Sequence, residues 1–175
     1  MGFGDTSTVC KIVFILLILC FLIDLIGFAI PFWYSKEYNV LGVNIKSYGG
    51  LWDLCGESGV IKSCVSIKDD GLADWYRAVR AFSILSWLFF LWALVVLIVF
   101  VFFMSDKKVM YLVTVCLSFA GAFCALIAFA VYAGQSSGVL KEYSASFALT
   151  IISFILGLII GVLGILDYLG VVGGK

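Results

Sequence analysis

The chain has 175 residues, of which 64% are hydrophobic and 13% are charged. A soluble domain carries about a quarter charged residues, so this much apolar surface needs lipid as its solvent. Eleven basic residues balance eleven acidic ones, which gives no electrostatic reason to expect binding to nucleic acid. Histidine, the commonest general base and metal ligand, is absent, and the six cysteines form no C-x-x-C pair. We therefore expect no enzymatic activity, no cofactor and no metal site.

Four apolar segments predict transmembrane helices: residues 12–32, 81–104, 111–132 and 145–166. Each has about 20 residues or slightly more, enough at 1.5 Å per residue to cross a hydrocarbon core of about 30 Å. They lack the alternation of polar and apolar residues that marks the strands of a membrane β-barrel. We expect one membrane domain over residues 1–175, with a first extracellular loop at 33–80, a second at 133–144 and a short cytoplasmic tail at 167–175.

Two residues near the N-terminus match lipidation patterns. Gly2 begins a stretch that fits the N-myristoylation pattern, and Cys10 lies at the expected cytoplasmic edge of the first span, where palmitoylation occurs. Both are therefore candidate lipidation sites.

Asp24 lies near the middle of the first span. A charge at the bilayer centre costs about 3 kcal/mol on insertion scales, so we expect this side chain to face the bundle, where it could be protonated. A structural hydrogen bond to a hydroxyl group on another span is the leading interpretation. A contact with a helix of a partner protein and a proton-linked role are the alternatives.

The first loop has the sequence pattern of a small β-sheet. Between residues 33 and 65, alternating apolar residues, β-branched and aromatic enrichment and punctuating glycines predict short antiparallel strands. A turn at Glu57-Ser58-Gly59 would bring Cys55 and Cys64 onto neighbouring strands within bridging distance. A disulfide that closes a loop of about ten residues would stabilise it by about 2–3 kcal/mol. The alternative is that both cysteines are free.

The end of the first loop leads into the second span. Acidic residues are followed there by Arg77 and Arg80, a charge order that suits the dipole of a short helix feeding that span. We expect Trp33, Trp52 and Trp75 near the outer membrane surface, where amphipathic rings prefer to lie.

The positive-inside rule does not favour cytoplasmic termini, because that orientation places four basic residues inside and seven outside. We nevertheless expect cytoplasmic termini and a plasma-membrane location, since a cysteine pair in a long loop makes most sense in an oxidising compartment. The tight turn that holds Lys107 and Lys108 also suits a cytoplasmic hairpin.

The fourth span contains three closely spaced glycines, Gly157, Gly161 and Gly164. Small residues at this spacing permit close approach of a second helix. Packing within the bundle is the leading interpretation, and self-association of the protein is the alternative.

These features together resemble the superfamily of the claudins, peripheral myelin protein and the epithelial membrane proteins. The similarity rests on Trp33, the Gly50-Leu51-Trp52 motif, the cysteines Cys55 and Cys64, and Arg80 at the start of the second span. The chain looks closest to the short-tailed lens fibre and epithelial membrane protein branch. The resemblance implies a left-handed bundle of four transmembrane helices with an extracellular antiparallel β-sheet, mostly from the first loop plus one strand from the second. It also implies that Trp33 and the Gly50-Leu51-Trp52 motif fix this sheet against the bundle.

Members of this superfamily adhere, polymerise side by side, line paracellular paths or accompany ion channels. Our leading hypothesis is adhesion between cells, or organisation of junctions and membrane domains, through the sheet. An accessory subunit of a channel or receptor, and a paracellular barrier or pore, are the alternatives. The expected partners are the lipid bilayer and either a second copy of the chain or a larger membrane protein such as a channel.

Three features depart from the pattern of tight-junction claudins. Val65 stands where pore-forming claudins often carry an acid, and Lys68 stands where strand-forming claudins place a hydrophobic contact residue. The tail lacks the Tyr-Val ending that claudins offer to PDZ domains, so we do not expect a PDZ scaffold as a partner.

Overall fold

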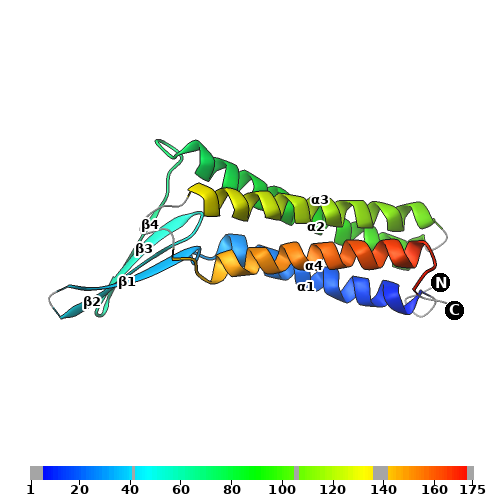
Figure 1. Cartoon of the computed structure of the whole chain (residues 1–175), viewed down its shortest axis with the longest axis horizontal. Coiled ribbons are helices and arrows are strands. Elements are labelled where there is room, and N and C mark those ends of the chain that lie inside the picture. The colour runs from blue at the N-terminus through cyan, green and yellow to red at the C-terminus, as the bar shows by residue number, and fades with distance from the viewer. Residues whose placement is uncertain (1–5, 41, 105–106, 136–141, 173–175) are drawn as a thin grey trace.

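Four long helices and a four-stranded sheet make up the computed structural model of the chain (Figure 1). The structure describes residues 6–40, 42–104, 107–135 and 142–172. The helices are α1 (Thr8–Ala29), α2 (Asp74–Phe103), α3 (Lys108–Gln135) and α4 (Ala145–Tyr168). All four are long and apolar enough to cross a membrane. The prediction of a four-helix membrane protein with an antiparallel sheet is confirmed.

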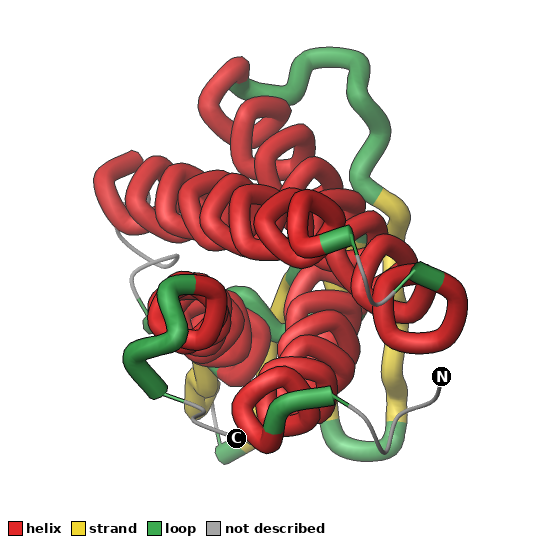
Figure 2. Tube along the Cα trace, turned by 90° about the vertical axis from the view of Figure 1, so that its right-hand side faces the viewer, coloured by secondary structure: helices red, strands yellow, loops and turns green. Residues whose placement is uncertain are grey.

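The helices form a closed ring of neighbours. Helix α1 packs against α2 and α4, and α3 packs against the same two helices. Figure 2 looks along the bundle from the end opposite the sheet and shows the four helices end-on. We call that end the terminal end, because α1 begins and α4 ends there, and the other end the sheet end (Figure 1).

The helix ends follow local chemistry that hydropathy alone does not report. Helix α1 begins at Thr8 because the Ser7 hydroxyl caps it by accepting a hydrogen bond from the Cys10 backbone N–H at 3.0 Å. It ends at Ala29, two residues before Pro31, because a proline disfavours helical geometry in the residue before it, here the extended Ile30. The short helix expected before the second span is continuous with it, so α2 starts at Asp74.

Three glycines of α4 lie where the helix meets its neighbours most closely. A Cβ added at Gly161 would lie 2.5 Å from the Phe119 ring, and one added at Gly164 would lie 2.5 Å from Val115 Cγ2. Both partners belong to α3, and a Cβ at Gly157 would meet the Phe90 ring of α2 at 2.9 Å.. The small residues thus let α4 approach α2 and α3 within the bundle.

The sheet is an antiparallel meander in the order β1-β2-β3-β4. Its strands are β1 (Tyr34–Val40), β2 (Val43–Gly49), β3 (Asp53–Ser58) and β4 (Ile61–Ser66). In the β3–β4 hairpin, Cys55 lies opposite Cys64, and the two form a disulfide with a Cα–Cα distance of 4.1 Å. The loop between these cysteines turns at Gly59 and Val60, so the expected turn at Glu57-Ser58-Gly59 is wrong in its position. A two-residue hairpin loop needs a residue with positive φ, and Gly59 supplies it at +60°.

The second loop adds less to the sheet than the resemblance implied. In the part of the loop that the structure describes, it contributes a single bridge, between Tyr143 and Tyr34 at the outer edge of β1. Residues 136–141 lie outside the described ranges. A backbone hydrogen bond from Ser35 N–H to the Glu142 carbonyl, 3.2 Å long, continues this contact.

Candidate functional site

The junction between the sheet and the bundle is built first by two tryptophans that complete the end of α1. The last carbonyl groups of a helix have no partner within the helix and need outside donors. The indole N–H of Trp33 donates to the Gly27 carbonyl at 3.1 Å, and that of Trp52 donates to the Phe28 carbonyl at 2.9 Å. Two residues far apart in the loop therefore bind the same helix end and fix the first strands relative to the bundle.

Trp33 is also the centre of the apolar contact at the sheet end. Its side chain is fully buried, and its ring centroid lies 4.9 Å from that of Tyr132 in α3 and 6.3 Å from that of Phe147 in α4. One side chain at the root of β1 thus contacts three helices.

The Gly50-Leu51 turn between β2 and β3 lies directly on the chain that leaves α1. A Cβ at Gly50 would lie 2.4 Å from Pro31 Cα and 2.8 Å from the Ile30 carbonyl oxygen, distances that only glycine permits. The Leu51 side chain is fully buried beneath the sheet. The Tyr76 hydroxyl, on the first turn of α2, donates to the Gly50 carbonyl. These contacts hold the turn between α1 and α2.

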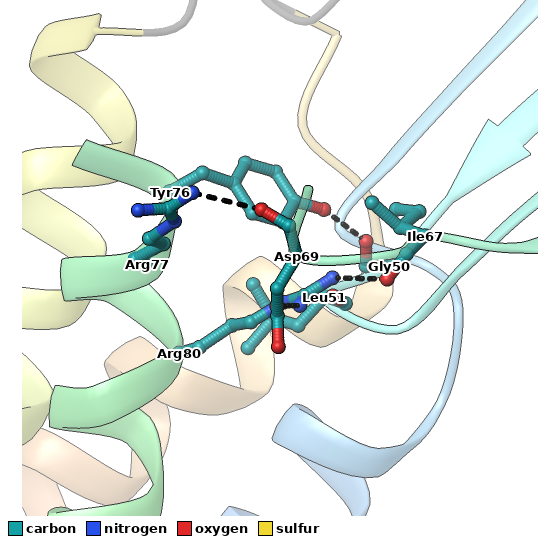
Figure 3. Close-up of polar contacts among 7 residues, drawn as sticks. All are labelled: Gly50, Leu51, Ile67, Asp69, Tyr76, Arg77 and Arg80. Carbon is teal, nitrogen blue, oxygen red and sulfur yellow. Dashed lines mark hydrogen bonds and ion pairs between the residues drawn. The ribbon is translucent and has the colours of Figure 1, made fainter. Parts of the chain in front are cut away.

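Arg80 of α2 joins this turn to the segment that follows β4 (Figure 3). Its Nε donates to the Leu51 carbonyl at 2.6 Å and its Nη2 donates to the Ile67 carbonyl at 3.1 Å. Its Nη1 pairs with the Asp69 carboxylate at 2.5 Å. The guanidinium also lies 5.1 Å above the Trp52 ring, which favours a cation. One buried cation therefore ties two separate parts of the first loop to α2.

One face of the sheet carries a row of alternating charges. Glu37, Lys46, Glu57 and Lys62 lie directly opposite one another on the four strands. Lys46 pairs with Glu37 at 3.0 Å. A hydrogen bond to the Tyr48 hydroxyl raises the pKa of Lys62 above its ordinary value. The two lysines balance the two glutamates of this row, and Asp53, on the same side of β3, leaves the face with one excess negative charge.

The opposite face of the sheet carries four exposed apolar side chains. Because side chains alternate along a strand, the register places Val43, Leu54, Ile61 and Val65 on the face away from the charged row. Their exposed fractions are 47%, 46%, 71% and 66%. We call these four residues the apolar face. A cross-strand row on the same side, made of Lys36, Ser47, Gly56 and Ser63, separates Leu54 and Val65 from Val43 and Ile61. The fixed sheet therefore presents apolar side chains that no described part of the chain covers, on both sides of this row.

Asp24 lies inside the bundle at mid-span. Its side chain is 4% exposed, and Oδ1 lies 2.7 Å from the Ser153 hydroxyl of α4. Within the described ranges, no group of three metal-ligating side chains comes together here or elsewhere.

The structure describes one of the two candidate lipidation residues, Cys10. Cys10 is 3% exposed, inside the terminal end of the bundle. There Ser7 donates to the Asp167 carboxylate at 2.8 Å and ties the start of α1 to the end of α4. Gly2 lies outside the described residues. Of the four free cysteines, Cys116 is the exposed one.

The sequence pattern singled out Trp33, the Gly50-Leu51-Trp52 motif and Arg80, and the structure places all of them at one junction between the sheet and the bundle. It also adds Asp69 and Tyr76, which sequence reasoning treated only as part of a helix start. The available signal was an acid in the loop upstream of an arginine near the membrane surface, a combination that suggests an ion pair.

Comparison with known proteins gives one finding. The model of the PMP-22/EMP/MP20/Claudin family matches residues 7–164. The matched range contains the whole sheet, α1, α2, α3 and most of α4. No curated protein sequence matches the chain closely enough to serve as a relative.

Proposed function

We propose, from the premise that the chain belongs to the PMP-22/EMP/MP20/Claudin family, that this protein organises contacts between cells or within membranes through its sheet. Family membership supports a non-enzymatic, multi-pass membrane protein. The apolar face of the sheet is the observation that carries the proposal.

The proposed location is the plasma membrane, with the sheet outside the cell and both termini in the cytoplasm. The Cys55–Cys64 disulfide supports this orientation, because disulfides form and persist in oxidising compartments. The start of α1 and the end of α4 lie at the terminal end, across the bundle from the sheet (Figure 1). If the sheet is extracellular, the terminal end is therefore cytoplasmic.

The apolar face supports a role in binding another protein for two reasons. Soluble surfaces rarely expose clustered apolar side chains unless a partner covers them. The face is also rigidly positioned, because hydrogen bonds of Trp33, Trp52 and Arg80 attach the sheet to α1 and α2 at its base. A fixed surface loses little conformational entropy on binding.

A second copy of the chain is the proposed partner. The four-stranded face covers about 400 Å², from strand spacings of about 4.8 Å and a rise of about 3.3 Å per residue. Two such faces would bury about 800 Å², less than the roughly 1,200–2,000 Å² of a stable pair. Single contacts would therefore be weak, and many copies in one membrane would be needed to hold a contact zone.

Expression in cells that do not otherwise adhere tests this proposal. We expect the wild-type protein to cluster at contacts and the double variant Ile61→Gln/Val65→Gln to lose this clustering. The matched control is Lys62→Gln, on the same strand but on the charged face, and it should cluster like the wild type. All three proteins must reach the surface in equal amounts. Absence of clustering by the wild type, or an equal loss in Lys62→Gln, would contradict the proposal.

An accessory subunit of a channel or receptor is a second candidate. Lys68 favours it, because this exposed cation follows β4 where strand-forming claudins place an apolar contact residue. Gentle extraction from native membranes distinguishes the two candidates. An assembly with a different membrane protein supports the accessory role, whereas assemblies of this chain alone support adhesion. A change in the resistance of an epithelial layer on expression would instead support a paracellular barrier or pore.

A further inference from the structure

Asp24 is an acidic residue that neither the junction nor the sheet uses. It faces α4 at a point where the two helices pack closely. One helical turn nearer the sheet, a Cβ added to Gly27 would lie 3.3 Å from Leu149 Cβ and 3.4 Å from Thr150 Oγ1. The carboxyl group is therefore held inside a tight seam between α1 and α4, and its side chain is 4% exposed.

The positions of the hydrogen-bonding atoms identify where a proton must lie. Ser153 Oγ is 2.7 Å from Asp24 Oδ1 and 2.9 Å from the Thr150 carbonyl oxygen. A serine hydroxyl has one proton to donate and two lone pairs that accept. With Asp24 ionised, this single proton is shared between two acceptors, whereas a proton on Oδ1 makes each short contact a full hydrogen bond. The chain of donors then runs from Asp24 Oδ1 to Ser153 Oγ and from Ser153 Oγ to the Thr150 carbonyl.

The ionised form would have little compensation on its other oxygen. Oδ2 is buried, and the Ser86 hydroxyl of α2, which lies beside the carboxyl group, is the one neutral donor near it among the described residues. As the carbonyl oxygen of a neutral acid, Oδ2 needs far less solvation than it would in a carboxylate.

Among the residues that the structure describes, no cation is close enough to hold an ionised Asp24. The titratable groups that interact with it are the thiols of Cys20 on α1 and Cys124 on α3. Lys11, on the same helix, is thirteen residues away, about 20 Å along the axis. Arg80 of α2 is engaged with the first loop. The segment that forms α4 contains no basic residue.

We propose that Asp24 is a buried proton-binding site, a neutral carboxylic acid that donates to Ser153 and ties α1 to α4. In water at neutral pH, an aspartate is ionised by roughly a thousand to one. Burial of an unpaired charge at mid-membrane outweighs that preference. The carboxyl group is therefore not available to a basic residue of a partner's transmembrane helix.

Infrared spectroscopy of the purified full-length protein in lipid nanodiscs tests the proposal. We expect the carbonyl stretch of a protonated carboxylic acid at neutral pH, lost in Asp24→Asn and retained in Asp167→Asn, the matched control for a second acid in a helix. An Asp24→Asn protein should still fold, because its amide N–H can donate to Ser153. A wild-type spectrum without this band at neutral pH would overturn the proposal, whether or not any variant folds.

A milder variant tests the specific hydrogen bond. Ser153→Ala removes only the acceptor, so the band should remain and move to the higher frequency of an acid with a weaker hydrogen bond. An unchanged frequency would overturn the assignment of Ser153 as the acceptor. Raising the pH of the wild type should leave the band in place beyond the range in which exposed acids have ionised, and its early loss would count as a refutation.

Discussion

Replacing Arg80 with methionine should release the sheet from the bundle. Methionine keeps most of the buried stem but removes every donor that Arg80 offers. The Leu51 carbonyl, which is buried, would lose a charged donor worth about 2 kcal/mol, and the Ile67 carbonyl would lose about 1 kcal/mol. The contact with the Trp52 ring adds about 1 kcal/mol. The pair with Asp69 adds little, because the Asp69 side chain is 79% exposed and water screens it.

The expected cost is therefore about 4 kcal/mol of the free energy that holds the sheet in place, or about a thousandfold in the opening equilibrium. Hydrogen exchange of the amides in β2 and β3, measured by mass spectrometry in nanodiscs, reports this opening directly. Arg77→Met is the matched control. Arg77 lies one turn earlier, its side chain is 50% exposed, and it should cost less than about 1 kcal/mol. Equal exchange in the two variants would refute the assignment of Arg80 as the tie.

Other contacts at the junction give further predictions. Gly50→Ala should lower the free energy of unfolding by about 1–3 kcal/mol and reduce delivery to the cell surface, because the new Cβ meets backbone atoms that cannot move aside. Gly56→Ala adds its Cβ in open space, so it should change surface delivery little. Trp52→Phe keeps an aromatic ring, smaller than indole, but removes the donor to the end of α1, and we expect the free energy of unfolding to fall by about 1–2 kcal/mol; an unchanged melting temperature would contradict the role of Trp52 as a donor to the helix end. Replacing Cys55 and Cys64 together by serine should cost about 2–3 kcal/mol and speed exchange in β3 and β4, and equal exchange with and without the disulfide would argue against this.

The sequence predicted those parts of the fold that depend on composition. Hydropathy located four spans because lipid imposes a minimum apolar length on any helix that crosses it. It misplaced the helix ends, since these depend on single residues: Ser7 caps α1, and Pro31 stops it. The β3–β4 turn consists of Gly59 and Val60, so of the expected turn residues only Gly59 belongs to it, because a two-residue loop depends on backbone conformation more than on polarity.

The residues of the junction could be predicted, but not their contacts. The resemblance implied that Trp33 and the Gly50-Leu51-Trp52 motif fix the sheet against the bundle, and it gave no partner atoms for them or for Arg80. Their roles are long-range, since the two indoles donate to carbonyl groups of a helix end and the guanidinium bridges two loop segments. Such partners are separated by up to 29 positions in the chain and leave no periodic signal. The two faces of the sheet, by contrast, follow from strand alternation once the register is known.

Photo-crosslinking from the apolar face tests whether the sheet binds a second copy of the chain. A photoreactive amino acid placed at position 61, on the apolar face, should form covalent dimers of this chain when cells that express it are in contact and illuminated. The same residue at position 62, on the charged face of the same strand, should give few or none. Dimers from position 62 alone, or no product from position 61 in cells whose contacts contain the protein, would contradict the account.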